Sequence, residues 1–176
     1  CVSITSVLMP QMVQFIKNNN FSDAIDMWKK SVTASYIVIC LFCTGIFVFA
    51  PQVISILYSE KYLDGTMVFR IYAFVTLFKV TYFGIVLNSM GKTSNILFCS
   101  VLSLIINVIF NFILYKIMGI TGPALATFFS VLILELIQLK MTSKYIGISF
   151  KDIFPWKNLG IISIINVLFG AIAYII

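Results

Sequence analysis

Long uninterrupted runs of apolar residues dominate the chain, with no sustained alternation of apolar and polar positions. A bilayer core about 30 Å thick is crossed by about 20 helical residues. Five runs reach that length: 33–57, 67–88, 94–115, 120–142 and 158–176. Short segments that are polar or rich in Gly and Pro separate them, as turns do. The pattern therefore predicts an all-α, polytopic transmembrane helix bundle of five full spans.

The residues before the first full span predict two shorter pieces. The opening CVSITSVLMP has neither a charged leader nor a small-residue cleavage site, so it does not resemble a signal peptide. We interpret 1–32 as the end of a truncated transmembrane helix followed by a cytoplasmic amphipathic linker, in which Ser22 caps a helix and Ile25 and Trp28 share an apolar face. A solvated linker is the alternative. The domain at 33–176 is then the C-terminal part of a longer protein.

Composition supports the membrane interpretation. The 176 residues are 61% apolar and 10% charged, whereas soluble domains carry about 45–50% and about 25%; the mean hydropathy is +1.07. These values exclude an ordinary soluble globule and a nucleic-acid-binding tail. The absence of histidine excludes a His-ligated zinc site and a Ser-His triad. We expect Cys40 and Cys43 to be packing residues, and we predict no catalytic residue, metal site or cofactor.

The basic residues are distributed unevenly over the two predicted membrane sides. One side receives Lys17, Lys29, Lys30, Lys92, Lys140, Lys144, Lys151 and Lys157, and the other receives Lys61, Arg70 and Lys116. Because cytoplasmic loops are enriched in Lys and Arg, the lysine-rich side is predicted to be cytoplasmic. Topology thus accounts for the net charge of +6 without a nucleic-acid partner.

Lys79 is the main candidate for function. It lies twelve residues after Met67, about 18 Å into its predicted span, where a charge costs about 2.5–3.5 kcal/mol on insertion scales. The hydroxyl-bearing residues at offsets of three or seven share its helix face: Tyr72, Thr76 and Tyr82. A cation flanked by hydroxyls suits an anionic or sugar-bearing ligand. An ion pair that only joins two helices is the structural alternative.

Glu135 is the natural counterpart of Lys79, because the predicted depths of the two residues differ by only about 4–5 Å. The pair could be a structural bridge or a proton-sensitive coupling site, and snorkelling of Glu135 toward the cytoplasmic edge is a third interpretation. In the predicted span 94–115, Asn107 and Asn111 lie on one stripe with Ser100 and Ser103. Such a stripe either joins helices or lines a polar cavity. Arg70 is either a cavity residue or an interfacial snorkeler.

Short motifs follow one another in a characteristic order: VLMPQ, NNNFSDAIDMWKKS, APQVISILYSEKY, LNSMGKTS and NVIFNFILYKIMGITGPALATFFS. This order resembles the C-terminal half of a polysaccharide flippase of the O-antigen (Wzx-type) class. That class belongs to the superfamily that includes the lipid II flippases and the MATE exporters. The resemblance covers roughly residues 7 to 145 and implies one half of a MATE-like transporter.

The resemblance also implies a function. The protein would translocate a polyprenyl-diphosphate-linked oligosaccharide across the cytoplasmic membrane by alternating access, without catalytic bond-breaking. The cargo's diphosphate implies a cationic cavity between two halves, so that Lys79 and Arg70 are candidate cargo residues. The implied partners are the lipid-linked oligosaccharide, membrane lipids and the missing N-terminal half.

Other functions stay open at this point. A MATE-type drug or metabolite exporter would share the scaffold. A membrane-embedded glycan-modifying enzyme, either a sugar polymerase or an acyltransferase, is a second alternative, although acyltransferases commonly need a histidine base. A purely structural membrane subunit is a third, which the predicted depth of Lys79 disfavours.

Overall fold

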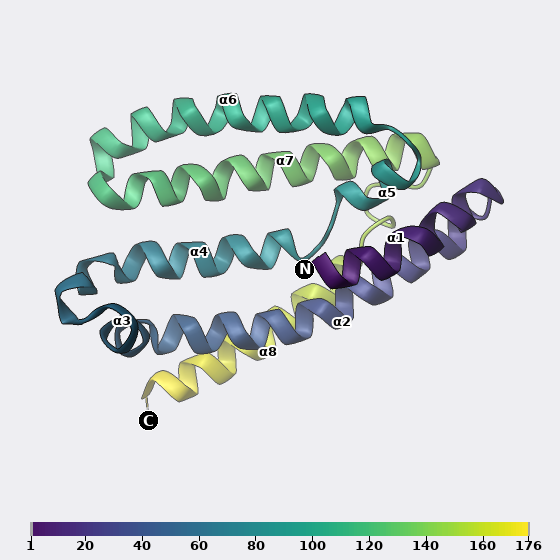
Figure 1. The fold of residues 1–176 in the computed structure, drawn as a ribbon. Coiled ribbons are helices and arrows are strands. Elements are labelled where there is room, and N and C mark those ends of the chain that lie inside the picture. The colour runs from purple at the N-terminus through teal and green to yellow at the C-terminus, as the bar shows by residue number, and fades with distance from the viewer. Residues whose placement is uncertain (1, 176) are drawn as a thin grey trace.

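The computed structural model describes residues 2–175, which form helices joined by short turns (Figure 1). The elements are α1 (Val2–Lys17), α2 (Phe21–Val48), α3 (Ala50–Tyr58), η1 (Glu60–Gly65), α4 (Thr66–Lys79), α5 (Gly84–Ser89), α6 (Thr93–Met118), η2 (Gly119–Thr121), α7 (Gly122–Ile146) and α8 (Trp156–Ile175). The predicted all-α class is confirmed.

The long helices pack in a row in the order α6, α7, α4, α2 and α8, each contacting the next (Figure 1). The short turn at η2 folds α6 and α7 into an antiparallel hairpin. The first helix, α1, packs against α2 and α5, in the half of the bundle that lies away from α3 (Figure 1). The row brings α2, α4, α7 and α8 around a common internal space, which is described below.

The prediction of five full spans is wrong. Among residues 2–175, three segments are long and apolar enough to cross a membrane: Phe21–Val48, Thr93–Ile146 and Trp156–Ala173. The predicted spans 94–115 and 120–142 both fall inside the second segment, which doubles back at η2 as α6 and α7. The predicted spans 33–57 and 67–88 are each interrupted. These apolar segments support a multi-pass membrane protein.

The interruption of 33–57 follows from a proline. The long helix α2 ends at Val48, and Pro51 lies in the first turn of α3. Proline has no N–H and clashes with the preceding helical turn, so a helix seldom continues through it. A count of apolar residues does not register this break.

The interruption of 67–88 has a different cause. Helix α4 ends at Lys79, and Tyr82 has a left-handed φ of 50° in the connection 80–83. The Thr81 hydroxyl donates a 2.6 Å hydrogen bond to Phe78 O, and the indole Nε1 of Trp28 donates a 3.0 Å bond to Thr81 O. These bonds satisfy carbonyls that a continuous helix would have paired with its own N–H groups.

The segment NNNFSDAIDMWKKS is not a surface linker. It forms the start of α2, whose N-cap is Asn20 and not Ser22; the Asn20 side chain accepts a 3.5 Å bond from Asp23 N. Ile25 and Trp28 do share an apolar face, but that face is covered by protein, and Trp28 is 0% exposed. The predicted amphipathic pattern is therefore present, with the apolar face packed into the core.

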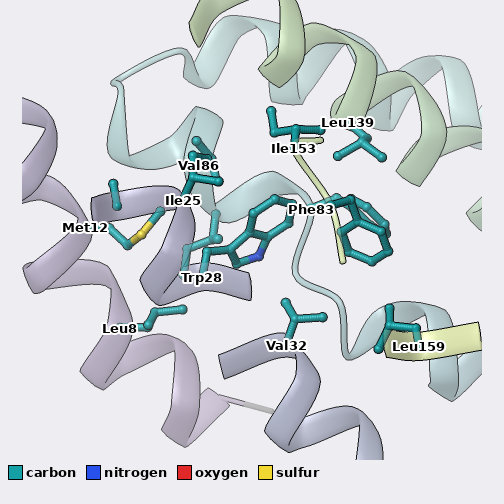
Figure 2. Packing of buried hydrophobic residues seen from close by; sticks show 13 residues of the cluster. Leu8, Met12, Ile25, Trp28, Val32, Phe83, Val86, Leu139, Ile153 and Leu159 are labelled. Atoms are coloured by element: carbon teal, nitrogen blue, oxygen red, sulfur yellow. The ribbon is translucent and has the colours of Figure 1, made fainter. Parts of the chain in front are cut away.

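Trp28 lies at the centre of the main hydrophobic cluster (Figure 2). Its ring contacts Phe83 at 6.0 Å and Phe154 at 5.7 Å between centroids. Residues from α1, α2, the connection 80–83, α5, α7 and the segment before α8 contribute to the cluster. The cluster fixes the connection between α4 and α5 to the rest of the bundle.

Candidate functional site

A cavity of about 760 Å³ lies between α2, α4, α7 and α8. Its walls are mainly apolar. The side chains with polar groups that line it, cysteines and Trp156 aside, are Tyr36, Thr44, Arg70, Thr81, Glu135, Ser163 and Asn166. The volume lies within the range of about 300–1,000 Å³ that small-molecule sites occupy. The cavity thus combines an apolar surface with one cation and one acid.

Arg70 lines the cavity near the end of α2. Its Nε donates a 3.0 Å hydrogen bond to Phe47 O, and its Cζ lies 5.0 Å from the Phe47 ring centroid. In a continuous helix Phe47 O would accept from the N–H four residues later, which is the position of Pro51. Arg70 therefore supplies the donor that the proline removes.

The hydrogen bond from Arg70 to Phe47 O can be tested by mutation. Arg70→Met should lower the free energy of unfolding by about 1.5–3 kcal/mol, the range for hydrogen bonds that involve a charged group. In a Pro51→Ala background the restored N–H can serve Phe47 O, so the same change should cost about 1 kcal/mol less. Thermal denaturation of the four variants in detergent measures this double-mutant cycle. An equal cost in both backgrounds would contradict the assignment.

A polar contact joins α2 to α8 along one wall of the cavity. The Tyr36 hydroxyl and Ser163 Oγ are 2.8 Å apart and share a hydrogen bond. Asn166 Nδ2 donates a 2.9 Å bond to Ile162 O, within its own helix. Beyond them, a Cβ added at Gly170 would lie 2.7 Å from Thr44 Cγ2, so the two helices approach closely there.

Glu135 projects from α7 into the same cavity. Its carboxyl group lies within hydrogen-bonding reach of the backbone N–H of Phe83 and within electrostatic range of Lys79. Its Oε2 atom is buried and has no hydrogen-bond partner in the described part of the chain. A buried polar atom without a partner is uncommon and calls for a physical explanation.

Lys79 is the last residue of α4, and its side chain is exposed. Tyr72 and Thr76 are also exposed on α4, with Thr76 Oγ1 bonded to Tyr72 O at 3.0 Å. Tyr82 is half-buried in the connection that follows. In the described region none of these four residues lines the internal cavity. The predicted residues thus divide into an outer group on and after α4 and an inner pair, Arg70 and Glu135.

The polar stripe of α6 faces α7. Ser103 Oγ donates a 3.1 Å bond to Ser130 O, and Asn107 Nδ2 donates a 3.0 Å bond to Ser130 Oγ. Asn111 Nδ2 donates to Asn107 O at 2.8 Å and to Asn107 Oδ1 at 2.9 Å. These contacts match the helix-joining interpretation of the stripe. A role of Asn107 and Asn111 in cargo binding stays a prediction.

Comparison with known proteins gives one informative match. No protein-family model and no solved structure match the chain. A protein of Haloferax volcanii named "probable low-salt glycan biosynthesis flippase Agl15" is 23% identical over 171 residues, which is 96% of this chain. The chain is a distant homologue of a glycan biosynthesis flippase. It spans 36% of the length of that relative.

Sequence reasoning missed the polar residues of the wall between α2 and α8. On α2, Tyr36, Cys40, Cys43 and Phe47 recur at spacings of three and four, which is the signature of one helix face. On α8, Ser163 and Asn166 are three apart within an otherwise apolar run. These two spacings could have predicted that the two helices face each other across a shared internal space.

The cysteines of α2 take part in packing. Cys40 and Cys43 are buried and free of disulfides, and Cys43 Sγ donates to Ala73 O at 3.1 Å. Within residues 2–175 there is no group of three or more His, Cys, Asp or Glu side chains able to hold a metal ion.

The segments that connect the long helices gather at the two ends of the bundle. The turn between α1 and α2, the helix α5 and the connection from α7 to α8 lie toward one end, and η1 and η2 lie at the other (Figure 1). Of the eight lysines assigned to the cytoplasmic side, Lys151 lies in the connection from α7 to α8. The other seven lie in or beside the parts of the long helices that adjoin these segments: Lys17, Lys29, Lys30, Lys92, Lys140, Lys144 and Lys157. Which end faces the cytoplasm stays a prediction.

Proposed function

We propose that the chain is part of an integral membrane flippase that translocates a polyprenyl-diphosphate-linked oligosaccharide across the cytoplasmic membrane. The cargo would be a repeat unit of O-antigen, capsule or exopolysaccharide. The homology to a glycan biosynthesis flippase over 96% of the chain supports the general class. The observation that carries the proposal is Lys79, a cation at the end of α4 with two hydroxyl-bearing side chains on the same exposed face.

We place α4 in the membrane beside α2 and α7, which it contacts, although α4 alone is shorter than a full span; the depth that this placement gives Lys79 supports the proposal. Lys79 is thirteen residues beyond the start of α4 at Thr66, about 20 Å along the helix axis. In a hydrocarbon core about 30 Å thick, such an amine is stable only when it faces water, an anion or another part of the protein. A diphosphate supplies compact negative charge, and the hydroxyls of Tyr72 and Thr76 suit the neighbouring sugar.

The break after Lys79 also favours a transporter. Discontinuous helices whose ends meet near the bilayer midplane are typical of transporter binding sites, because the free helix ends carry partial charges. Lys79 sits beside the negative, C-terminal end of α4, which stabilises the ammonium group. A subunit with a purely structural role has no use for a costly cation and a broken helix at this depth.

The proposed mechanism is physical and involves no bond-breaking, cofactor or metal. Lys79, Tyr72, Thr76 and Tyr82 would hold the polar head while the bundle alternates between inward- and outward-open states, with Arg70, Asn107 and Asn111 as further candidates. Glu135 would couple the alternation to an ion gradient. Because the chain spans 36% of its relative's length, we propose that the rest of the same protein supplies the facing half of the cavity.

A second candidate is a MATE-type exporter of drugs or metabolites. The internal cavity favours it, because mainly apolar walls with one carboxyl group and one guanidinium group suit a lipophilic organic molecule. In that case the cargo would bind in the internal cavity between α2, α4, α7 and α8, and not on the outer face of α4.

Reconstitution of the full-length protein in proteoliposomes separates the two candidates. A fluorescent polyprenyl-diphosphate oligosaccharide should become accessible to an impermeant quencher in the opposite leaflet, whereas efflux of a cationic dye should stay at the rate of empty liposomes. Dye efflux without movement of the glycolipid would reject the flippase proposal in favour of the exporter.

A further inference from the structure

The Glu135 carboxyl group has an unusual environment. Its Oε2 is buried and unpartnered among the described residues, although the side chain borders a cavity large enough for solvent. Transfer of an ionised carboxylate from water into such a site without compensating hydrogen bonds costs many times the energy of transferring the neutral acid. The packing observed here therefore fits the protonated group better than the ionised one.

The same carboxyl group touches the break between α4 and α5. It lies within hydrogen-bonding reach of Phe83 N–H, in the connection 80–83. Elsewhere in the connection, Val80 N bonds to Thr76 O at 3.2 Å and Thr81 N bonds to Phe78 O at 3.0 Å, so these groups are satisfied locally. Glu135 is thus one of the side chains through which α7 holds the far side of the break, together with Gln138 beside Gly84 and Leu139 in the hydrophobic cluster.

The charged and titratable groups around Glu135 are few, and the connection 80–83 that it contacts contains one, Tyr82. From α4, Lys79 is within electrostatic range, and Arg70 lines the same cavity. From α2, Tyr36, Cys40 and Cys43 line it. Helix α5 contains no titratable side chain, and on α6 the buried Cys99 contacts Met141, almost two turns from Glu135 along α7. The described cavity-lining residues of α8 are not ionisable.

We propose that Glu135 is a proton-operated latch on the break between α4 and α5. In the protonated state the carboxyl group stays buried against Phe83 N–H and holds α5 to α7. Loss of the proton to water in the cavity leaves a carboxylate that is poorly solvated at this position. The carboxylate then moves toward the exposed ammonium group of Lys79 and releases the N–H of Phe83. The connection is then held by the Trp28 cluster without the Glu135 contact, which allows the angle between α4 and α5 to change.

This latch gives a physical form to the coupling role proposed above for Glu135. It is nevertheless a property of the helices and needs no cargo. A conformational measurement can therefore reject the latch while the flippase proposal stands, and a transport measurement can reject the flippase while the latch stands.

The test uses the full-length protein in lipid nanodiscs with Cys1, Cys40, Cys43 and Cys99 replaced by alanine. Spin labels are placed at the exposed residues Met67 on α4 and Asn88 on α5, and the distance between them is measured by pulsed electron paramagnetic resonance from pH 5 to 9. We expect two distance populations that exchange with pH in the parent protein. Because glutamine stays neutral, Glu135→Gln should show the low-pH distance at every pH from 5 to 9. The control variant Glu60→Gln, on the exposed η1, should show the same pH dependence as the parent.

A second variant tests the partner. The Lys79 cation favours the ionised carboxylate, so Lys79→Gln should move the midpoint of the exchange to higher pH. A distance that does not depend on pH in the parent, an unchanged titration in Glu135→Gln, or an unchanged midpoint in Lys79→Gln would each overturn the latch.

Discussion

Trp28→Ala is expected to lower the free energy of unfolding by about 3–5 kcal/mol, the range for removing a large aromatic side chain from a core. The side chain is 0% exposed and packs against Phe83 and Phe154. Its indole also donates to Thr81 O, so the substitution removes a buried donor to the broken end of α4 as well. Both effects act on the same connection, and the cluster should lose its hold on α5.

The second tryptophan of the chain provides a matched control. Trp156 is 42% exposed, so Trp156→Ala should change the melting temperature in detergent much less than Trp28→Ala, as followed by circular dichroism. Trp28→Phe should fall between them, because it keeps most of the ring but loses the hydrogen bond, at a cost of about 1–3 kcal/mol. Equal melting temperatures for Trp28→Ala and Trp156→Ala would show that the cluster does not organise the bundle.

Gly122→Ala is expected to disrupt the hairpin of α6 and α7. A Cβ at this position would overlap the carbonyl carbon and oxygen of Leu114 and would lie 2.6 Å from Tyr115 N. These are backbone atoms of α6 that cannot rotate away, so the two helices must separate or their facing turns must unwind. Overpacking of this kind typically costs about 1–3 kcal/mol and sometimes more. The bonds from Asn107 to Ser130 lie on the same interface.

Gly45→Ala is the control for this prediction. Gly45 lies within α2, and nothing stands within 4 Å of where its Cβ would be. Alanine in a helix interior is about 0.5–1 kcal/mol more favourable than glycine, so this variant should be neutral or slightly more stable. The two variants are compared by the fraction that survives heating as a monodisperse peak in size-exclusion chromatography. Survival of Gly122→Ala equal to that of Gly45→Ala would contradict the close approach.

The helical fold was predictable from the lengths of the apolar runs, but the number of spans was not. Apolar length gave α2, α6, α7 and α8 because hydrocarbon-compatible residues fill each of them. It did not predict that α2 ends at Val48, just before Pro51, nor that α4 ends where Thr81 and Trp28 supply replacement hydrogen bonds. The second break depends on a contact between residues 53 positions apart, which no local pattern contains.

The candidate site was predictable in part for a related reason. Depth along a helix follows from residue number, and this placed Lys79 and Glu135 at similar depths, where they could meet if their helices touch. The two helices, α4 and α7, do contact each other, and a pairing of the two side chains stays a prediction. Which way each side chain points depends on the neighbouring helices. Arg70 was expected at an interface or in a cavity; it lines the internal cavity and also pairs with the carbonyl that Pro51 leaves free. The apolar face containing Trp28 was visible in the sequence, but not that α1 and the segment before α8 cover it.

The most direct test of the account is the rate at which the full-length protein moves a fluorescent polyprenyl-diphosphate oligosaccharide across a proteoliposome bilayer, measured for the parent, Lys79→Gln and Lys79→Arg. If the α4 cation binds the diphosphate, Lys79→Gln should transport at least tenfold more slowly, since one lost charged contact of about 1.4 kcal/mol corresponds to that factor. Lys79→Arg should retain most of the rate, and both variants should insert and fold as the parent does. Transport by Lys79→Gln at the parental rate would contradict the assignment of this residue to the cargo.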